Sequence, residues 1–190
     1  LFGYSPTFET LQGASGRLAR LIEDRAGGAP YALIGHSLGT VIIRATLARL
    51  AGRMPVACFF LAPPMLACKA ARFFSRFWLY KTMMGEMGRL LASEDFMRGL
   101  PLPPGRLRIY AGTGGPRAAW FPFGMEANDG ILSVAEATGA CAAAAVRVPA
   151  LHTFIMNSAP VVDDISRTLA ELAKVRTIRT SGAPEQDPCP

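Results

Sequence analysis

The sequence predicts an α/β fold in which a mostly parallel sheet carries helices on both faces. Short apolar runs typical of buried strands alternate with longer segments whose apolar residues recur at helical spacing. The length of 190 residues and the hydrophobic content of 51% suffice for one domain with its own core. We therefore expect a single domain over residues 1–175, followed by a polar, proline-bearing and flexible tail over residues 176–190.

Local patterns along the chain indicate where the helices and strands begin and end. Leu11, Leu18 and Ile22 recur at helical spacing, and Gly27 ends that helix. The predicted helices are Thr10–Arg25, Thr40–Leu50 and, after Pro160, Val161–Lys174. The predicted strands, in chain order, are Tyr31–Ile34, Val56–Leu61, Leu107–Ala111 and Ala144–Val148.

Charge, hydropathy and cysteine usage exclude several classes of function. The 20 Lys and Arg residues outnumber the 14 Asp and Glu residues, but they are scattered, so we expect no nucleic-acid partner. The longest apolar stretch, Pro55–Cys68, is interrupted by Pro63 and Pro64, so we expect no transmembrane segment. The four cysteines form no CxxC pair, so we expect neither a metal site nor a cofactor, with Cys58 a buried free thiol.

The pentapeptide GHSLG at positions 35–39 matches the Gly-x-Ser-x-Gly pattern of a nucleophile elbow. The five letters alone are a weak signal, and an ordinary glycine-bounded turn is the alternative interpretation. Their place decides between the two, because they join the predicted strand Tyr31–Ile34 directly to the predicted helix Thr40–Leu50. Ser37 is therefore the candidate nucleophile.

The residues beside Ser37 have their own predicted roles. A sharp strand-to-helix turn strains the serine backbone, and a side chain at Gly35 or Gly39 is expected to collide with the neighbouring strand or helix. The helix that follows points its positive end at the reacting group. The backbone N–H of Leu38 is therefore the candidate oxyanion donor.

A serine hydroxyl needs a base to remove its proton, and the chain has only two histidines. His36 is adjacent to Ser37, and neighbouring side chains in a tight turn diverge, so it cannot easily bond the hydroxyl. His152 follows the last predicted strand, in a loop at the edge of the sheet where a base belongs. His152 is therefore the candidate base, and an exposed loop histidine without a role is the alternative.

The third group should be a carboxylate that orients the imidazole. Asp129 lies in the loop after the strand Leu107–Ala111 and so reaches the same edge of the sheet, although Asn-Asp-Gly is also a plain turn sequence. We take Asp129 as the acid, with Glu126 in reserve. The other carboxylates between the serine and the histidine are Glu86, Glu94, Asp95 and Glu136.

From Tyr4 to about Lys174 the chain resembles bacterial α/β-hydrolases of the triacylglycerol-lipase and esterase type. Three segments carry the resemblance: YALIGHSLG at 31–39, NDGILSV at 128–134 and HTFIM at 152–156. The resemblance implies an α/β-hydrolase fold and a Ser-Asp-His order of the reacting groups.

One departure from that family concerns the second oxyanion donor. Its members carry a His-Gly motif on a loop after an earlier strand, and no such motif precedes Ser37. The chain begins at Leu1, inside patterned sequence, so we expect an incomplete N-terminus with the early strands missing. Loss of one oxyanion donor costs on the order of 3 kcal/mol of transition-state stabilisation.

Residues 66–100 are a candidate lid or cap. Aromatic residues alternate with basic ones, and methionines follow, which suits contact with acyl chains or a lipid interface. The favoured alternative is a pair of helices that pack ordinary core residues. The residues concerned are Lys69, Arg72, Phe73, Phe74, Arg76, Phe77, Trp78, Tyr80, Lys81, Met83, Met84 and Met87.

The sequence therefore predicts a serine hydrolase that cleaves carboxylic esters, with a small-molecule or lipid ester as substrate and peripheral contact with a lipid interface. An acyltransferase, thioesterase or amidase would use the same three residues, because these reactions differ in which group enters the acyl-enzyme. A catalytically impaired fragment or a binding module that retains the elbow is the third possibility.

Overall fold

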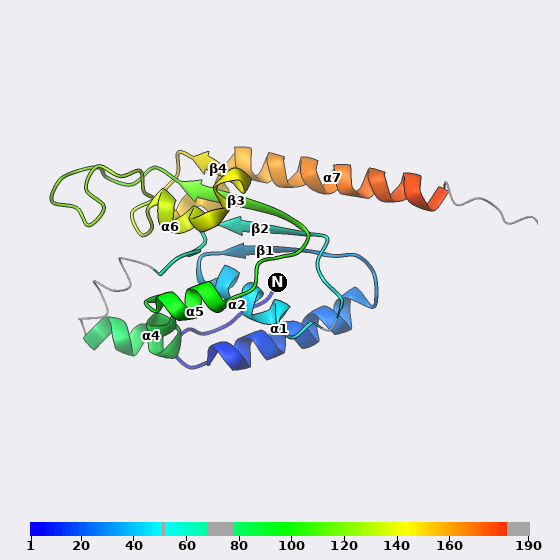
Figure 1. Ribbon diagram of the computed structural model, residues 1–190, viewed down its shortest axis with the longest axis horizontal. Helices are drawn as coiled ribbons and strands as arrows, with labels where there is room; N and C mark the ends of the chain where they lie inside the picture. The colour runs from blue at the N-terminus through cyan, green and yellow to red at the C-terminus, as the bar shows by residue number, and fades with distance from the viewer. Residues whose placement is uncertain (51, 68–77, 182–190) are drawn as a thin grey trace, which may run out of the picture.

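A computed structural model describes residues 1–50, 52–67 and 78–181. Within these residues the strands β1 (Ala32–His36), β2 (Ala57–Leu61), β3 (Arg106–Gly112) and β4 (Ala145–Val148) form one sheet in the order β1-β2-β3-β4. Each neighbouring pair is parallel. The carboxyl ends of all four strands therefore lie at the same edge of the sheet (Figure 1).

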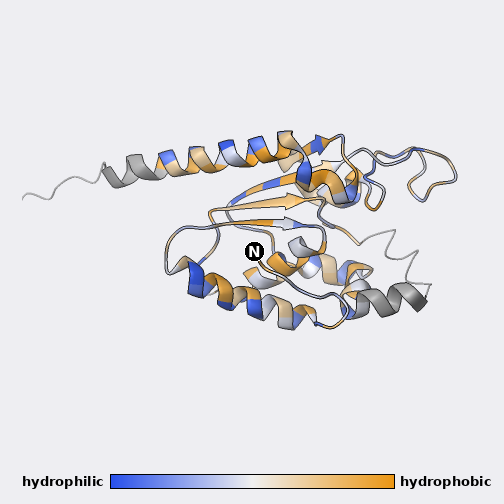
Figure 2. Cartoon of the chain, turned by 180° about the vertical axis from the view of Figure 1, so that it is seen from behind, coloured by the Kyte–Doolittle hydropathy of each residue, from blue (hydrophilic) through white to orange (hydrophobic). Residues whose placement is uncertain are grey.

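Helices cover both faces of this sheet. On one face α1 (Leu11–Ala26) and α2 (Leu38–Leu47) pack against β1 and β2, and on the other α7 (Ala159–Ser181) packs against β2 and β3 (Figure 1). The strands are largely apolar while α7 carries both polar and apolar residues (Figure 2), as expected for a buried sheet under a helix with one solvent face. The predicted α/β class with a parallel sheet is confirmed.

Shorter elements surround the carboxyl edge of the sheet. The helices α4 (Trp78–Leu91) and α5 (Glu94–Gly99) occupy part of the candidate cap, and Met87 and Met97 are buried in the core beneath them. The aromatic and basic residues of the cap at positions 69–77 lie outside the described residues. The remaining elements are α6 (Val134–Thr138) and the 3-10 helices η1 (Gly139–Ala144) and η2 (His152–Asn157).

The helix ends differ from the predicted ones by one to seven residues, and two of the differences are informative. The helix α2 begins at Leu38, directly after the elbow, and not at Thr40. The helix α7 continues to Ser181 and not only to Lys174, so part of the segment predicted as a tail is helical. No glycine or proline interrupts 161–181, and the next such residue is Gly182, which explains the longer helix.

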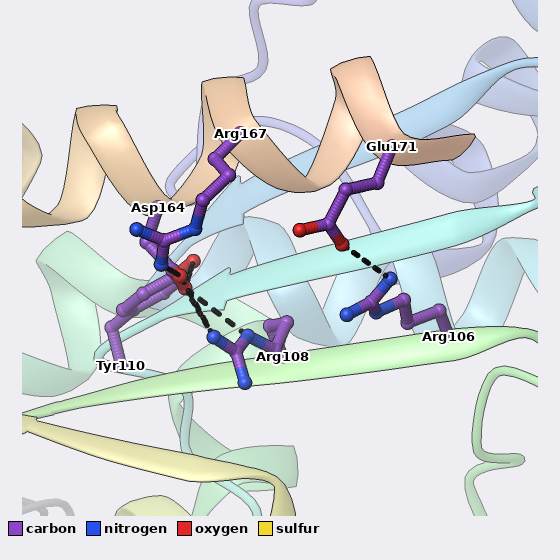
Figure 3. Close-up of polar contacts among 6 residues, drawn as sticks. All are labelled: Arg106, Arg108, Tyr110, Asp164, Arg167 and Glu171. Carbon is purple, nitrogen blue, oxygen red and sulfur yellow. Dashed lines mark hydrogen bonds and ion pairs between the residues drawn. The ribbon is translucent and has the colours of Figure 1, made fainter. Parts of the chain in front are cut away.

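A polar cluster attaches α7 to β3 (Figure 3). The carboxylate of Asp164, which is only 7% exposed, accepts hydrogen bonds from the Arg108 guanidinium at 2.7 and 2.8 Å and from the Tyr110 hydroxyl at 2.8 Å. Burial would raise the pKa of Asp164, but the hydrogen bonds and the charge of Arg108 outweigh it and lower the pKa. Further along α7, Glu171 forms an exposed ion pair with Arg106 at 3.3 Å.

Two further observations bear on the predicted exclusions. Cys58 on β2 is a buried free thiol, as predicted, and burial raises its pKa to about 12. Among the residues that the structure describes, no helix combines the length and the hydropathy needed to cross a bilayer.

Candidate active site

The elbow places Ser37 in a strained backbone conformation between β1 and α2. Its φ of 49° and ψ of −123° lie outside the regions that a serine ordinarily adopts, at a cost of about 1–3 kcal/mol. Backbone contacts maintain this conformation. The Ser37 N–H donates to the Leu61 carbonyl at 2.9 Å, and the Thr40 hydroxyl donates to the Ser37 carbonyl at 2.7 Å.

The two glycines of the elbow differ in what surrounds them. A Cβ at Gly35 would lie 2.7 Å from the Ile43 side chain and 3.2 Å from the Thr40 backbone nitrogen, so a side chain there would press on α2. A Cβ at Gly39 would meet only the Tyr4 hydroxyl, at an ordinary 3.8 Å. The predicted collision is therefore correct for Gly35 and wrong for Gly39, because the first turn of α2 leaves open space on that side.

The start of α2 leaves a hydrogen-bond donor beside the serine. Leu38 is the first residue of the helix, and the first N–H groups of a helix have no acceptor within it. Ser37 occupies the N-cap position, but its hydroxyl makes no capping bond to the helix. The Leu38 N–H thus lies at the positive end of α2, and the Ser37 hydroxyl is left for another partner.

That partner is His152, which lies 115 positions further along the chain. His152 Nε2 is 2.9 Å from Ser37 Oγ. His152 opens η2 just beyond the end of β4, and its own N–H donates to the Asp129 carbonyl at 2.9 Å. The side chain is 11% exposed, so the imidazole is shielded while one edge still reaches the hydroxyl.

Asp129 lies on the opposite side of the same imidazole. Its Oδ2 is 2.8 Å from His152 Nδ1, while its Oδ1 accepts the N–H groups of Ile131 and Leu132 at 2.9 and 2.7 Å. The carboxylate is 1% exposed and is surrounded by hydrogen-bond donors. Glu126, the reserve candidate, is exposed, so the geometry favours Asp129 at this position.

The loop that carries Asp129 depends on two features that the sequence did not reveal. Asn128 is fully buried, donates to the Pro116 and Glu126 carbonyls at 2.9 Å each, and accepts the Gly130 N–H at 2.9 Å. A Cβ at Gly112, the last residue of β3, would lie 2.7 Å from the Asp129 Cβ, so only glycine lets the loop come this close. Turn sequences with asparagine are common, and nothing local signals that this one is buried.

A groove along β1 is separate from Ser37, Asp129 and His152. It has a volume of about 1060 Å³, follows β1 between α1 and α7, and reaches His36 and Gly39 but not Ser37. The Tyr31 carbonyl accepts the Val56 N–H, and the Ser37 N–H donates to the Leu61 carbonyl, so both residues bond toward the β2 side. Backbone groups alternate in direction along a strand, so those of Ala32 and Ile34 point away from β2, toward the groove. The lining is mostly apolar, but it includes none of Ser37, Asp129 and His152, so we assign this groove no substrate.

Comparison with solved structures supports the fold. The chain is similar to the mature form of the Bacillus licheniformis lipase BlEst2, with a TM-score of 0.62 over 85% of this chain and 74% of that chain, at 16% identity. No protein-family model and no curated protein sequence matches the chain. The similarity shows a lipase-like α/β-hydrolase fold, and at this identity it shows the fold alone.

Proposed function

We propose that this protein is a serine esterase in which Ser37 is the nucleophile, His152 the general base and Asp129 the orienting acid. The observation that carries the proposal is the unbroken line of contacts from Ser37 Oγ through the His152 imidazole to Asp129 Oδ2, at 2.9 and 2.8 Å. Both lengths are within hydrogen-bond reach, and the order of groups is the one that activates a serine.

The contacts support a two-step acyl transfer. Because Asp129 is an acceptor, it selects the imidazole tautomer with the proton on Nδ1, which leaves Nε2 free to take the Ser37 proton. The hydroxyl oxygen then attacks the ester carbonyl, the carbon–oxygen bond to the alcohol breaks, and the imidazolium returns its proton to the leaving alcohol. Water deprotonated by the same nitrogen cleaves the acyl-enzyme and restores the serine.

The N-terminal end of α2 supplies the electrostatic part of the mechanism. Negative charge develops on the carbonyl oxygen in each tetrahedral intermediate, and the Leu38 N–H is the donor that we assign to it. The dipole of α2 acts in the same direction.

The side chains around His152 support an apolar acyl ester as substrate. Leu151, Phe154 and Met156 flank this residue in the chain and are 42%, 60% and 45% exposed. Exposed apolar side chains of this size beside a reacting group suit an acyl chain or the surface of a lipid aggregate. The lipase fold of the solved neighbour points to the same substrate class.

Covalent labelling with a fluorophosphonate tests the proposal. We expect the reagent to phosphonylate Ser37 in the wild-type protein, to leave Ser37→Ala unlabelled and to label His152→Ala far more slowly. Peptide mapping by mass spectrometry identifies the labelled residue. Label that persists in Ser37→Ala would reject the assignment, and a wild-type protein that takes no label would indicate a binding module that merely retains the elbow.

A further inference from the structure

We infer that His36 is a positioning residue: its imidazole holds the backbone of His152 and so sets the distance between His152 and the serine. The inference rests on the proposed function, because it assigns a role within the same site. His36 Nε2 lies 3.0 Å from the His152 carbonyl oxygen, and the two ring centroids are 5.0 Å apart.

Hydrogen-bond chemistry determines which proton this contact uses. A carbonyl oxygen can only accept, so His36 Nε2 must carry the proton and donate it. Burial, with a smaller contribution from the neighbouring His152, lowers the pKa of His36 despite the opposing effects of the carbonyl contact and Asp129. The ring is therefore neutral at pH 7. Its imidazolium form would also donate from Nε2, so the contact does not require one protonation state.

The contact joins segments that are far apart in the sheet. His36 ends β1, whereas His152 follows β4, and these are the two outer strands of the described sheet. The N–H of His152 donates to the Asp129 carbonyl. The peptide of His152 is thus held from the acid side by Asp129 and from the nucleophile side by His36.

The position of His36 next to Ser37 gives the contact its consequence. Since the two residues share a peptide bond, the elbow positions both the nucleophile and the clamp, by which we mean the His36 imidazole that holds the backbone of the base. Removal of the clamp frees His152 to move away from Ser37 while Asp129 still holds its ring. A displacement of about 1 Å between reacting groups lowers turnover by about a hundredfold.

Two substitutions of similar size separate the effect of the His36 hydrogen bond from the effect of side-chain packing. His36→Leu removes the donor, whereas His36→Gln keeps an N–H group at a similar reach. We expect His36→Leu to lower kcat for p-nitrophenyl butyrate by roughly 10-fold to 100-fold with KM nearly unchanged. We expect His36→Gln to restore most of kcat, and both variants to keep the wild-type thermal midpoint. Asn157→Ala, an exposed change in η2 at a residue with no assigned role in binding, is the control.

A second measurement does not depend on turnover. The chain has only two histidines, so NMR of protein with ¹⁵N-labelled imidazoles resolves His152 unambiguously in each His36 variant. We expect sharp His152 signals from the Nδ1-protonated tautomer in the wild-type protein and in His36→Gln, and exchange-broadened signals in His36→Leu. If His36→Leu does not fold, His36→Asn replaces it, because its amide is too short to reach the carbonyl.

The outcomes distinguish the two proposals. A His36→Leu variant with wild-type kcat and sharp His152 signals would overturn the positioning role, as would a His36→Gln variant impaired as strongly as His36→Leu. A wild-type protein that neither hydrolyses the ester nor takes the fluorophosphonate would overturn the esterase proposal instead. In that case the His152 signals still decide whether His36 holds the loop.

Discussion

Two buried aspartates of this protein, Asp129 and Asp164, are satisfied in opposite ways. Asp164 on α7 is bound by the permanently charged guanidiniums of Arg108 and Arg167 and by the Tyr110 hydroxyl (Figure 3). Asp129 at the carboxyl edge of the sheet is bound by two backbone N–H groups and by the imidazole of His152. Both carboxylates are nearly inaccessible, at 1% and 7% exposure.

The two aspartates differ in whether their partner side chains carry a permanent charge. At Asp164 the opposite charge is always present, so the cluster stabilises one arrangement of α7 on the sheet at neutral pH. At Asp129 the partner is an imidazole, which carries a charge only when it holds a second proton, as it does in the proposed reaction. The first arrangement suits stability, and the second suits proton transfer.

Of the substitutions that distinguish the Asp129 site from the Asp164 cluster, Asp129→Asn is expected to have the largest effect, and this effect is on turnover. Its Oδ1 can still accept from Ile131 and Leu132, but an amide NH₂ facing His152 Nδ1 would move the imidazole proton to Nε2, where it blocks transfer from Ser37. We expect turnover to fall by about four orders of magnitude with little loss of stability. Steady-state kinetics on p-nitrophenyl butyrate measures this. Glu126→Gln is the control, and an equal loss there would reassign the acid.

A smaller effect, on stability and not on turnover, is expected from Asp164→Asn. The change weakens the charged hydrogen bonds from Arg108, which should lower the free energy of unfolding by about 2 kcal/mol. Because the folded-state pKa of Asp164 is lowered, this contribution is complete above the unfolded-state pKa of about 4 and is lost as pH falls through the folded-state pKa. Urea unfolding of both proteins at pH 7 and at pH 3 checks this, and a gap that stays constant would contradict it.

The smallest effect is expected from Glu171→Gln on the same helix. The side chains of Arg106 and Glu171 are 43% and 51% exposed, and ion pairs this exposed contribute little. We expect the free energy of unfolding to change by less than about 0.5 kcal/mol. Urea unfolding alongside Asp164→Asn measures the contrast. A loss as large as that of Asp164→Asn would show that α7 is held along its length and not by the buried cluster.

Local pattern was sufficient for the four strands, for α1, α2 and the start of α7, for the fold class and for the candidate residues of the site, but not for α6, η1 and η2. Strand and helix periods placed β1, α2, β3 and β4 within a few residues of their positions, because these periods report which faces are buried. The strained turn at Ser37 follows from its flanking glycines and its place between a strand and a helix. The roles of Ser37, Asp129 and His152 in catalysis stay predictions, although the structure brings the three together.

Contacts that depend on how elements pack were not visible in the sequence. Asp163 and Asp164 are neighbours on one helix, and only the rotation of α7 on the sheet directs the second toward Arg108. In the same way, Asn128 has the sequence context of an ordinary turn residue, and only the folded loop buries it. The interaction of His36 with His152 joins residues that are 116 positions apart.

Short-range chemistry, such as the period of apolar residues or the freedom of glycine, acts within a few positions and can be seen in the letters. Contacts between distant residues form only after parallel strands have brought their ends to one edge. The tertiary structure therefore decides whether Asp129 or Glu126 lies beside His152, and it decides which groups donate hydrogen bonds to each buried carboxylate.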